Sequence, residues 1–266
     1  MTNTFKTSLR VIMACLMATF ALAGCRNGTT YKDNVVPQEL KVTTMSDSTH
    51  VYVSSKDSTF GCNYELGAMV DFPTSGPSPL TDSIKRFVYL ELYHIFDGGD
   101  NESNIHIPFD QVCTLGGDNI VTDFVSSYEP LYAQTEGCGT GADFLTLSLI
   151  AQTETFVTYS AEYMSCGAGC SYDHNFFTFR KRDGHLIRKI ATTENLKRFV
   201  KDYPDYSEAI NFENYVSFYG LTEDGMLYGY YLPFGPYSGA PEIITIPYSE
   251  IDSYLTKEAQ ELIPVE

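Results

Sequence analysis

Two neighbouring stretches in the middle of the chain alternate apolar with polar residues, and this period of two constrains the fold more than any other feature. They read FLTLSLI over Phe144–Ile150 and FVTYSAEY over Phe156–Tyr163. Successive side chains of a strand point to opposite faces of a sheet, so the pattern is typical of half-buried β-strands. The middle of the chain is therefore predicted to form sheet.

Two Asp-Gly pairs predict hairpins further along, because these residues tolerate the positive φ angles of tight hairpin turns. Asp183-Gly184 lies between Asn175–Phe179 and Leu186–Ile190, and Asp224-Gly225 lies between Val216–Leu221 and Leu227–Tyr231. Further strands are expected at His50–Val53, Phe60–Leu66 and Glu242–Ile246.

Helices are expected between these strands. The first follows a capping residue, Thr81, and runs through His94, with apolar residues recurring at helical spacing: Ile84, Val88, Leu92 and Ile95. A second is expected around Asn119–Tyr132, a third from Thr193, and a closing one from Ser249. Hairpins with separate helices predict an α+β fold, with an antiparallel sheet packed against a few helices.

The N-terminus has the features of an export signal. Lys6 and Arg10 precede an apolar run, Val11–Ala23, that is shorter than the about 20 residues needed to span a bilayer. The closing Leu22-Ala23-Gly24-Cys25 resembles the lipobox of bacterial lipoproteins, which implies cleavage before Cys25 and lipid attachment to its sulfur. The alternative is a secreted protein with an unrelated cysteine. We expect an envelope lipoprotein held in the cell membrane or outer membrane and facing the periplasm or the surface.

Five segments are expected on this basis: a signal over 1–24, the lipidated cysteine and a flexible tether over 25–49, an N-terminal α+β portion over 50–162, a C-terminal portion over 163–257 and a tail over 258–266. The tether assignment rests on a polar stretch from Arg26 to Thr49 with little periodicity.

The charge balance limits the partners. The chain carries 17 Lys and Arg against 34 Asp and Glu, a formal net charge of -17. Nucleic-acid backbones are bound through Lys and Arg, so this balance argues against a nucleic-acid partner. It permits a basic protein partner drawn in by long-range attraction, although solubility alone also explains it.

The cysteines suit an oxidising compartment. Cys166 and Cys170 enclose a short glycine-rich loop and are disulfide candidates, with Cys138 as the other partner considered for either. Cys62 and Cys113 complete the set outside the signal and Cys25, and the pairing is left open because sequence does not give it. Cys166, Cys170 and His174 also recur every fourth residue, which leaves a zinc site as the weaker alternative.

No motif of a known reaction stands in the chain. It lacks Gly-x-Ser-x-Gly, His-Glu-x-x-His and Gly-x-x-x-x-Gly-Lys, and the acidic loop Asp97–Glu102 lacks the EF-hand glycine. We expect no cofactor or metal and no catalytic residue. An enzyme acting on cell wall or glycan, with an active site not located, stays open as the alternative.

An aromatic tract rich in Pro and Gly follows the second hairpin. Tyr in such a tract supplies rigid contact area with a polar tip, which suits recognition surfaces as well as cores. Tyr231, Phe234 and Tyr237 are the partner-binding candidates, with core packing as the competing role.

The order of features from Tyr163 onward resembles a known family, the extracellular domain shared by the anti-sigma factor RsiV and peptidoglycan deacetylases of the PdaC type. The resemblance rests on the following segments: Cys166–Gly169, Phe177–Phe179, Asp183-Gly184, Leu221–Met226, Pro233–Tyr237 and Ile246–Ile251. It covers about a third of the chain. Family members often carry His directly after Gly-Ala, where this chain has Gly169 and Cys170.

The resemblance implies a non-catalytic binding or sensing module. In RsiV this part binds lysozyme, a basic protein, which fits the acidic charge here. We therefore expect a lipid-anchored module that binds a lysozyme-like protein or a cell-wall ligand. A purely structural envelope component is the remaining alternative.

Overall fold

The computed structural model describes residues 39–53, 62–96, 120–126, 140–167, 169–210, 217–231 and 240–263. Contacts between residues group Pro37–Glu266 into one compact unit. The predicted signal, Cys25, Cys113, Cys138, the loop Asp97–Glu102, Phe234 and Tyr237 lie outside the described residues.

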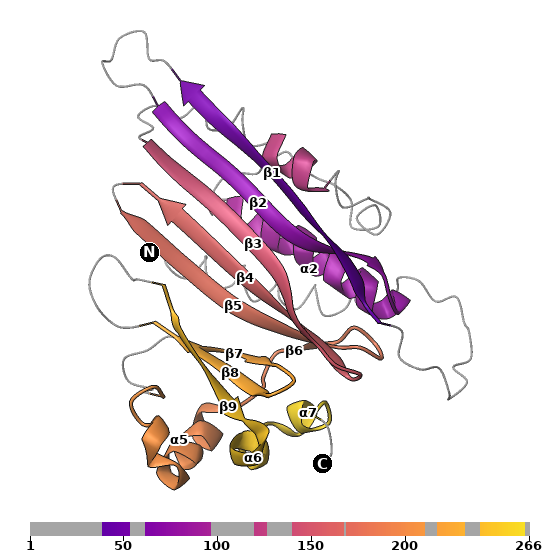
Figure 1. The fold of residues 1–266 in the computed structure, drawn as a ribbon, viewed down its shortest axis with the longest axis vertical. Coiled ribbons are helices and arrows are strands. Elements are labelled where there is room, and N and C mark those ends of the chain that lie inside the picture. Colours follow the sequence, from indigo (N-terminus) through magenta and orange to yellow (C-terminus); the bar gives the residue numbers. More distant parts are fainter. Residues whose placement is uncertain are drawn as a thin grey trace, which may run out of the picture. The chain divides into compact units, whose positions relative to one another are not determined.

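The larger of two sheets has six strands in the order in which they occur along the chain (Figure 1). They are β1 (Lys41–Val53), β2 (Cys62–Ser75), β3 (Thr140–Gln152), β4 (Phe156–Cys166), β5 (Cys170–Arg180) and β6 (Leu186–Ile187). The α+β prediction is confirmed. The sheet is not wholly antiparallel, however, because β2 and β3 run parallel. Parallel neighbours need a crossover connection, and the chain between them includes a long helix.

That helix, α2 (Ser78–Phe96), packs on one face of the larger sheet. It begins three residues before the expected cap, and the Thr81 hydroxyl donates to the carbonyl of Ser78 within its first turn. A second helical segment spans 120–126, within the range expected for it. The helices and the sheet enclose the first core, whose fully buried members include Leu66, Val70, Leu80, Ile84, Val88, Leu145, Leu147 and Tyr159.

The smaller sheet is antiparallel and consists of β7 (Ser217–Leu221), β8 (Gly225–Tyr230) and β9 (Glu242–Pro247). One of its faces packs against α5 (Thr193–Asp202), η1 (Pro204–Tyr206), α6 (Tyr248–Ile251), η2 (Asp252–Tyr254) and α7 (Lys257–Gln260). Thr192 caps α5 by accepting from the backbone N–H of Asn195. The second core between them includes Phe156, Leu196, Phe199, Leu221, Tyr228, Ile246 and Ile251.

Both predicted Asp-Gly hairpins are present. Gly184 has a φ of 69°, which favours glycine, and the Arg180 guanidinium binds the Asp183 carboxylate at 2.8 Å across the turn. The returning strand β6 has only two residues, shorter than Leu186–Ile190. In the second hairpin the turn covers 222–224 and Gly225 already belongs to β8.

Three expected boundaries differ from the structure. The tether was expected to reach Thr49, but β1 begins at Lys41, and its polar side chains reflect an exposed strand at the edge of the sheet. The division between 162 and 163 falls inside β4, whose neighbours come from both sides of it. Part of the expected tail is packed, because α7 lies there and Leu262 is buried in the second core.

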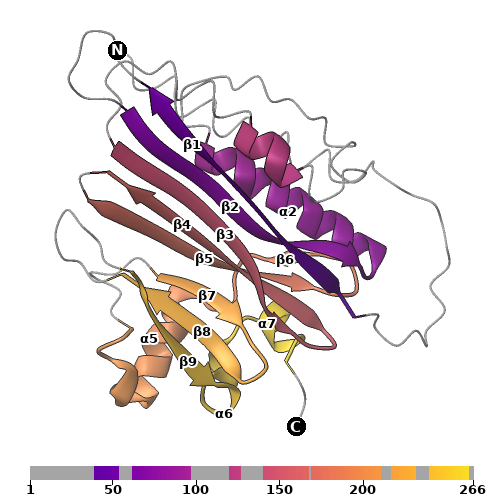
Figure 2. The same ribbon diagram turned by 45° about the horizontal axis from the view of Figure 1, so that its top comes forward.

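The two sheets meet along β5 and β7 (Figure 2). The backbone N–H of Leu221 donates to the Thr178 hydroxyl at 3.2 Å, and the Thr158 and Thr178 hydroxyls are 2.9 Å apart. On the smaller sheet, Phe218 contacts Phe176 and stacks on His174. This junction fixes how the surfaces described below face each other.

Candidate functional site

We call the face of the larger sheet opposite α2 the outer face. Cross-strand pairs place Ser160 and Phe176 on this face, and the smaller sheet covers them through Phe218. The half formed by β1, β2 and β3 is not covered by the smaller sheet, which lies beside β5 in Figure 1. The outer face is therefore partly core and partly surface.

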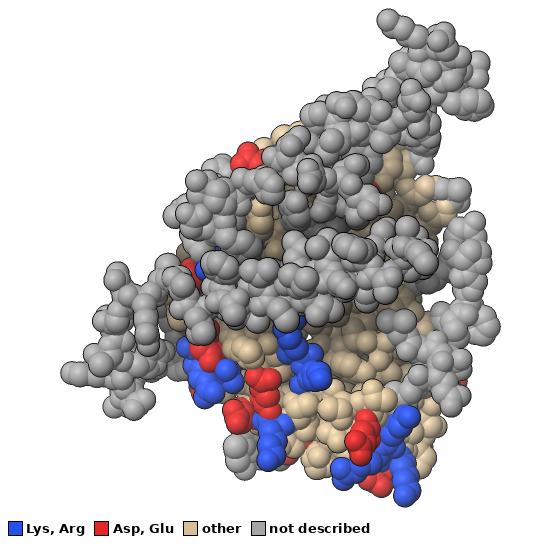
Figure 3. Space-filling view, turned by 180° about the vertical axis from the view of Figure 1, so that it is seen from behind, with Lys and Arg blue, Asp and Glu red and all other residues tan. Residues whose placement is uncertain are grey.

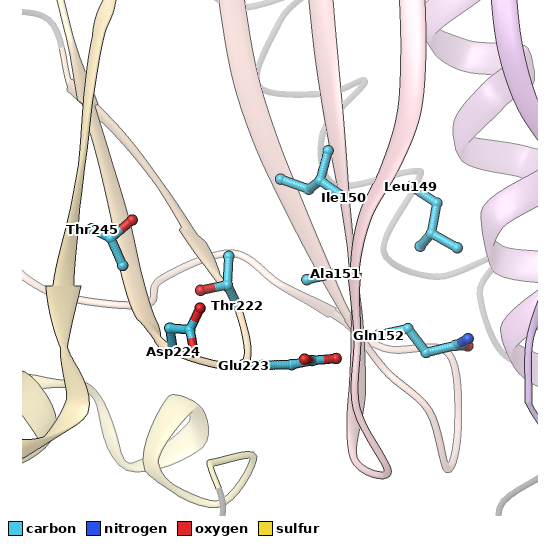
Figure 4. A pocket seen from close by; sticks show the side chains of 8 residues that line it. All are labelled: Leu149, Ile150, Ala151, Gln152, Thr222, Glu223, Asp224 and Thr245. Carbon is cyan, nitrogen blue, oxygen red and sulfur yellow. The ribbon is translucent and has the colours of Figure 1, made fainter.

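A cleft opens where the two sheets diverge from their junction. It has a volume of about 430 Å³ and is lined by the end of β3, the turn between β7 and β8, and β9: Leu149, Ile150, Ala151, Gln152, Thr222, Glu223, Asp224 and Thr245. In Figure 4 the side chains of Ile150 and Thr245 point toward each other across the cleft, whereas Leu149 points away from it. The cleft is thus walled by one face of each sheet.

Among the described residues, large exposed apolar side chains lie on β2 and β5 of the outer face and on β3 and β9, the two strands that wall the cleft. They are Met69, Ile150, Tyr172 and Ile243, with exposed fractions of 42%, 41%, 36% and 43%. Ile243 lies on the same face of β9 as Thr245, because strand residues two apart share a face. Exposed apolar groups that cluster, with a polar rim, mark interaction surfaces more often than single ones do.

Two carboxylates stand at the edge of the cleft, on the turn between β7 and β8. The turn is held by Thr222, whose N–H and hydroxyl both donate to the carbonyl of Gly225, and by the Tyr248 hydroxyl, which donates to the Thr222 carbonyl at 2.7 Å. Burial, and then the Asp224 carboxylate, raise the pKa of Tyr248. Glu223 and Asp224 themselves are exposed, on a turn whose backbone these hydrogen bonds hold.

Glu223 also borders a second depression, of about 330 Å³, with Thr153, Glu154 and Thr155. Neither lining includes Lys or Arg. A nearby cation is Lys181, a buried residue whose backbone N–H donates to the Thr155 carbonyl. Burial lowers the pKa of Lys181, while Glu39 and Glu154 oppose that shift. Glu154 is thus partly compensated, and the negative potential of the cleft rests on Glu223 and Asp224.

The junction beside the cleft contains a Ser–His contact without the properties of a nucleophile. His174 Nε2 lies 2.8 Å from Ser160 Oγ, and the same hydroxyl donates to Glu162 at 3.3 Å. Both residues are buried, and the imidazole stacks on Phe218 with ring centroids 5.1 Å apart. Burial lowers the pKa of His174, although the Glu162 and Asp173 carboxylates oppose the shift. The pair stabilises the sheet junction and offers no access to a substrate.

Of the three aromatic candidates, the structure describes only Tyr231. Its ring is half-buried and packs on Phe218 with centroids 5.8 Å apart. Burial and the Asp173 carboxylate raise its pKa to about 12. Tyr231 therefore lies at the junction and does not line the cleft.

Cys166 and Cys170 form a disulfide at the tip of the hairpin between β4 and β5. Both sulfurs are used in this bond, so neither is available as a thiolate for zinc. Within the described ranges, no group of three or more His, Cys, Asp or Glu side chains could hold a metal ion. No helix among the described residues is both long and apolar enough to cross a membrane.

One local feature of the sequence marks the cleft. Leu149 and Ile150 are consecutive apolar residues that break the alternation of β3, and the pairing of β3 with β4 shifts register between Leu149 and Ala151. Ile150 keeps the direction of Ser148, and the bulge brings the next residue, Ala151, to the same face, because Ala151 pairs with Thr158. The contribution of Thr245 and Ile243 depends on how two separate sheets pack, which local patterns do not encode.

No family model matches the sequence, and no curated protein matches it either. Among solved structures, the chain is similar to a DUF3298 family member from Bacteroides fragilis, with 15% identity and a TM-score of 0.50, over 84% of this chain and 96% of that one. A DUF3298 family protein from Pseudomonas aeruginosa matches with 12% identity and a TM-score of 0.46, over 88% and 99% of the two chains. The first likeness shows that the chain has the fold of a domain family of unknown function. It does not extend to the narrower resemblance to RsiV and PdaC.

Proposed function

We propose that this chain is a non-catalytic binding module of the bacterial cell envelope. It is anchored through lipid on Cys25, faces the periplasm or the surface, and binds a basic protein at the cleft between its two sheets. The observation that carries the proposal is a pair of exposed apolar side chains beside Glu223 and Asp224: Ile150 lines the cleft, and Ile243 shares a face of β9 with the lining residue Thr245. The lipobox-like Leu22–Cys25 supports the anchor.

The charge distribution supports a basic partner. The described Lys and Arg residues concentrate in the segment from Arg180 to Lys201. Several of them pair with acids there, as Arg180 does with Asp183 and Arg182 does with Glu261. Figure 3, seen from behind, shows these two kinds of charge interspersed. The charged residues in the cleft lining are both acids, Glu223 and Asp224. A basic partner would therefore be steered toward the cleft and away from the basic segment.

A lysozyme-like muramidase is the sharpest candidate partner, on the resemblance to RsiV and on charge. The test is a calorimetric titration of the full chain, in mild detergent, with a basic lysozyme at low and moderate salt. We expect saturable one-to-one binding that weakens as salt is raised, because screening reduces attraction between exposed charges. A folded sample that gives no heat at either salt would exclude lysozyme as the partner.

Substitutions in the cleft test whether the partner binds there. Glu223→Gln with Asp224→Asn should weaken binding several-fold and flatten its salt dependence, and Ile150→Ser with Ile243→Ser should weaken it at every salt concentration. The matched control removes two exposed acids outside the cleft lining, with Glu194→Gln in α5 and Asp205→Asn in η1. If the control weakens binding as much as the cleft variant, the attraction is general and the cleft is not the site.

A further inference from the structure

A second depression lies on the uncovered half of the outer face and has a different chemistry from the cleft. It has a volume of about 350 Å³, at the low end of the about 300–1,000 Å³ typical of small-molecule sites, and lies over β1, β2 and β3. Cross-strand pairing sets two rows of side chains on this face. Ser48, Gly67 and Phe144 form one row, and Ser46, Met69 and Thr146 form the next.

The floor of the depression is Gly67, and the ring of Phe144 lies against it. A Cβ atom on residue 67 would stand 2.7 Å from Cε1 and 2.8 Å from Cδ1 of Phe144, closer than carbon atoms pack. The absence of a side chain at Gly67 therefore lets the half-buried aromatic ring lie across the neighbouring strand. The thioether of Met69 is the other apolar wall.

Three hydroxyls surround this aromatic wall. The side chains of Ser46, Ser48 and Thr146 make no hydrogen bond among the described parts of the chain, so each offers a donor and two acceptors. Asp47 also borders the depression, but its partner Ala68 is buried in the first core, which places the Asp47 side chain on the opposite face. The lining of the depression thus combines an aromatic ring with neutral polar groups, and the exposed carboxylates of Glu65 and Glu162 stand beside it on the same face.

This combination favours one class of ligand. A pyranose ring has an apolar C–H face that stacks on an aromatic ring, and hydroxyls at its rim that need hydrogen-bond partners. A purely apolar ligand would desolvate the three hydroxyls without pairing them, which is costly. An extended peptide would lack backbone partners, because β2 is already paired on both of its edges.

A second aromatic side chain extends the site across the sheet. Phe144 pairs with Met164 on β4, which pairs with Tyr172 on β5. Phe144 and Tyr172 are two strands apart, a separation of about 10 Å, and both lie on the outer face. We infer that this row binds an uncharged, extended glycan chain, with one sugar ring on Phe144 among the hydroxyls of Ser46, Ser48 and Thr146, and another near Tyr172. This site is independent of the proposed protein-binding cleft.

The test is calorimetric titration of the full chain with three neutral probes. Cellohexaose and chitohexaose are extended β-linked chains, and maltohexaose is a curved α-linked chain. We expect saturable binding of at least one β-linked hexaose and weaker binding of maltohexaose. A folded chain that binds neither β-linked probe would overturn the inference, and equal binding of maltohexaose would overturn the match to an extended chain.

The decisive variant removes only hydroxyls. Ser46→Ala, Ser48→Ala and Thr146→Val together keep the apolar wall and the fold, and should lower glycan affinity at least tenfold. Gly67→Ala, which pushes the Phe144 ring out of place, should do the same, whereas Gly167→Ala, with no atom within 4 Å of the new Cβ, should not. Unchanged glycan affinity in the triple variant would refute the site. Glycan binding that depends on Glu223 and Asp224 would also refute it and assign the ligand to the cleft.

Discussion

Replacing Glu91 with Gln should stabilise the protein at pH 8 and leave its stability at pH 4 unchanged. Glu91 is one helical repeat of seven residues after the buried Ile84, so α2 turns both toward the larger sheet. Its side chain is partly buried. Burial, and then repulsion from the Asp173 carboxylate, raise the pKa of Glu91 from 4.5 to about 7.

Stability falls as pH rises because the folded chain keeps the Glu91 proton to a higher pH than the unfolded chain does. Below pH 4.5 Glu91 is protonated in both the folded and the unfolded chain, and its carboxyl group costs no stability. Between pH 4.5 and about 7 the unfolded chain releases this proton first, so the free energy of unfolding falls as pH rises. At 1.36 kcal/mol per pKa unit the loss would approach roughly 3 kcal/mol, and partial solvent exposure reduces it to about 2 kcal/mol.

The assay is urea unfolding of the wild type and of Glu91→Gln at pH 4, 6 and 8. We expect a gain of about 2 kcal/mol at pH 8, a smaller gain at pH 6 and none at pH 4. Asp173→Asn should give part of the same gain, because it removes the repulsion but not the burial, and the exposed control Glu194→Gln should give none. The reasoning would be refuted if the gain from Glu91→Gln were equal at all three values of pH or absent at pH 8.

Two further predictions concern the hairpin tip and the sheet junction. Replacing Cys166 and Cys170 by Ser opens a five-residue loop and should lower the free energy of unfolding by about 2 kcal/mol. The measurement is urea unfolding, with the reduced wild type for comparison. An unchanged unfolding midpoint would show that strand pairing alone holds the hairpin. Gly229→Ala would place a Cβ 2.2 Å from Cε2 and Cζ of Phe218 and should cost about 1–3 kcal/mol, whereas Gly167→Ala should cost close to nothing. Equal thermal midpoints for these two glycine variants would contradict the packing of Phe218 on β8.

The strands that sequence predicted best are those with one buried face. In β3, Leu145 and Leu147 enter the first core while Thr146 and Ser148 stay partly exposed, and the resulting alternation is visible in the sequence. The first half of β1 gave no such signal because the strand lies at the sheet edge, with Ser46 and Ser48 exposed on one face. The polar stretch Lys41–Thr49 therefore has the composition of a tether although it forms a strand.

Features that depend on pairing between distant segments could not be predicted from the sequence. The parallel pairing of β2 with β3 joins segments separated by α2, and the sequence carries no marker of which strand lies beside which. The candidate sites depend on the same information. Gly67 and Phe144 are ordinary residues in their own strands, and they form a depression only because those strands are neighbours. The Asp224-Gly225 pair predicts a turn, which is present, but the position of Glu223 and Asp224 beside Ile150 depends on how the two sheets pack.

The two cores share strand β4, and this limits how the fold can be divided in evolution or in the laboratory. Phe156 at the start of β4 is fully buried in the second core, while its neighbour Val157 is fully buried in the first. A fragment beginning at Tyr163 would contain all three strands of the smaller sheet and every helix beneath it, yet it would lack a side chain at the centre of that core. The smaller sheet and its helices are thus not an independently folding domain. Gene fusions that carry it should retain β4 whole, and with it the partner strands that hold β4 in place.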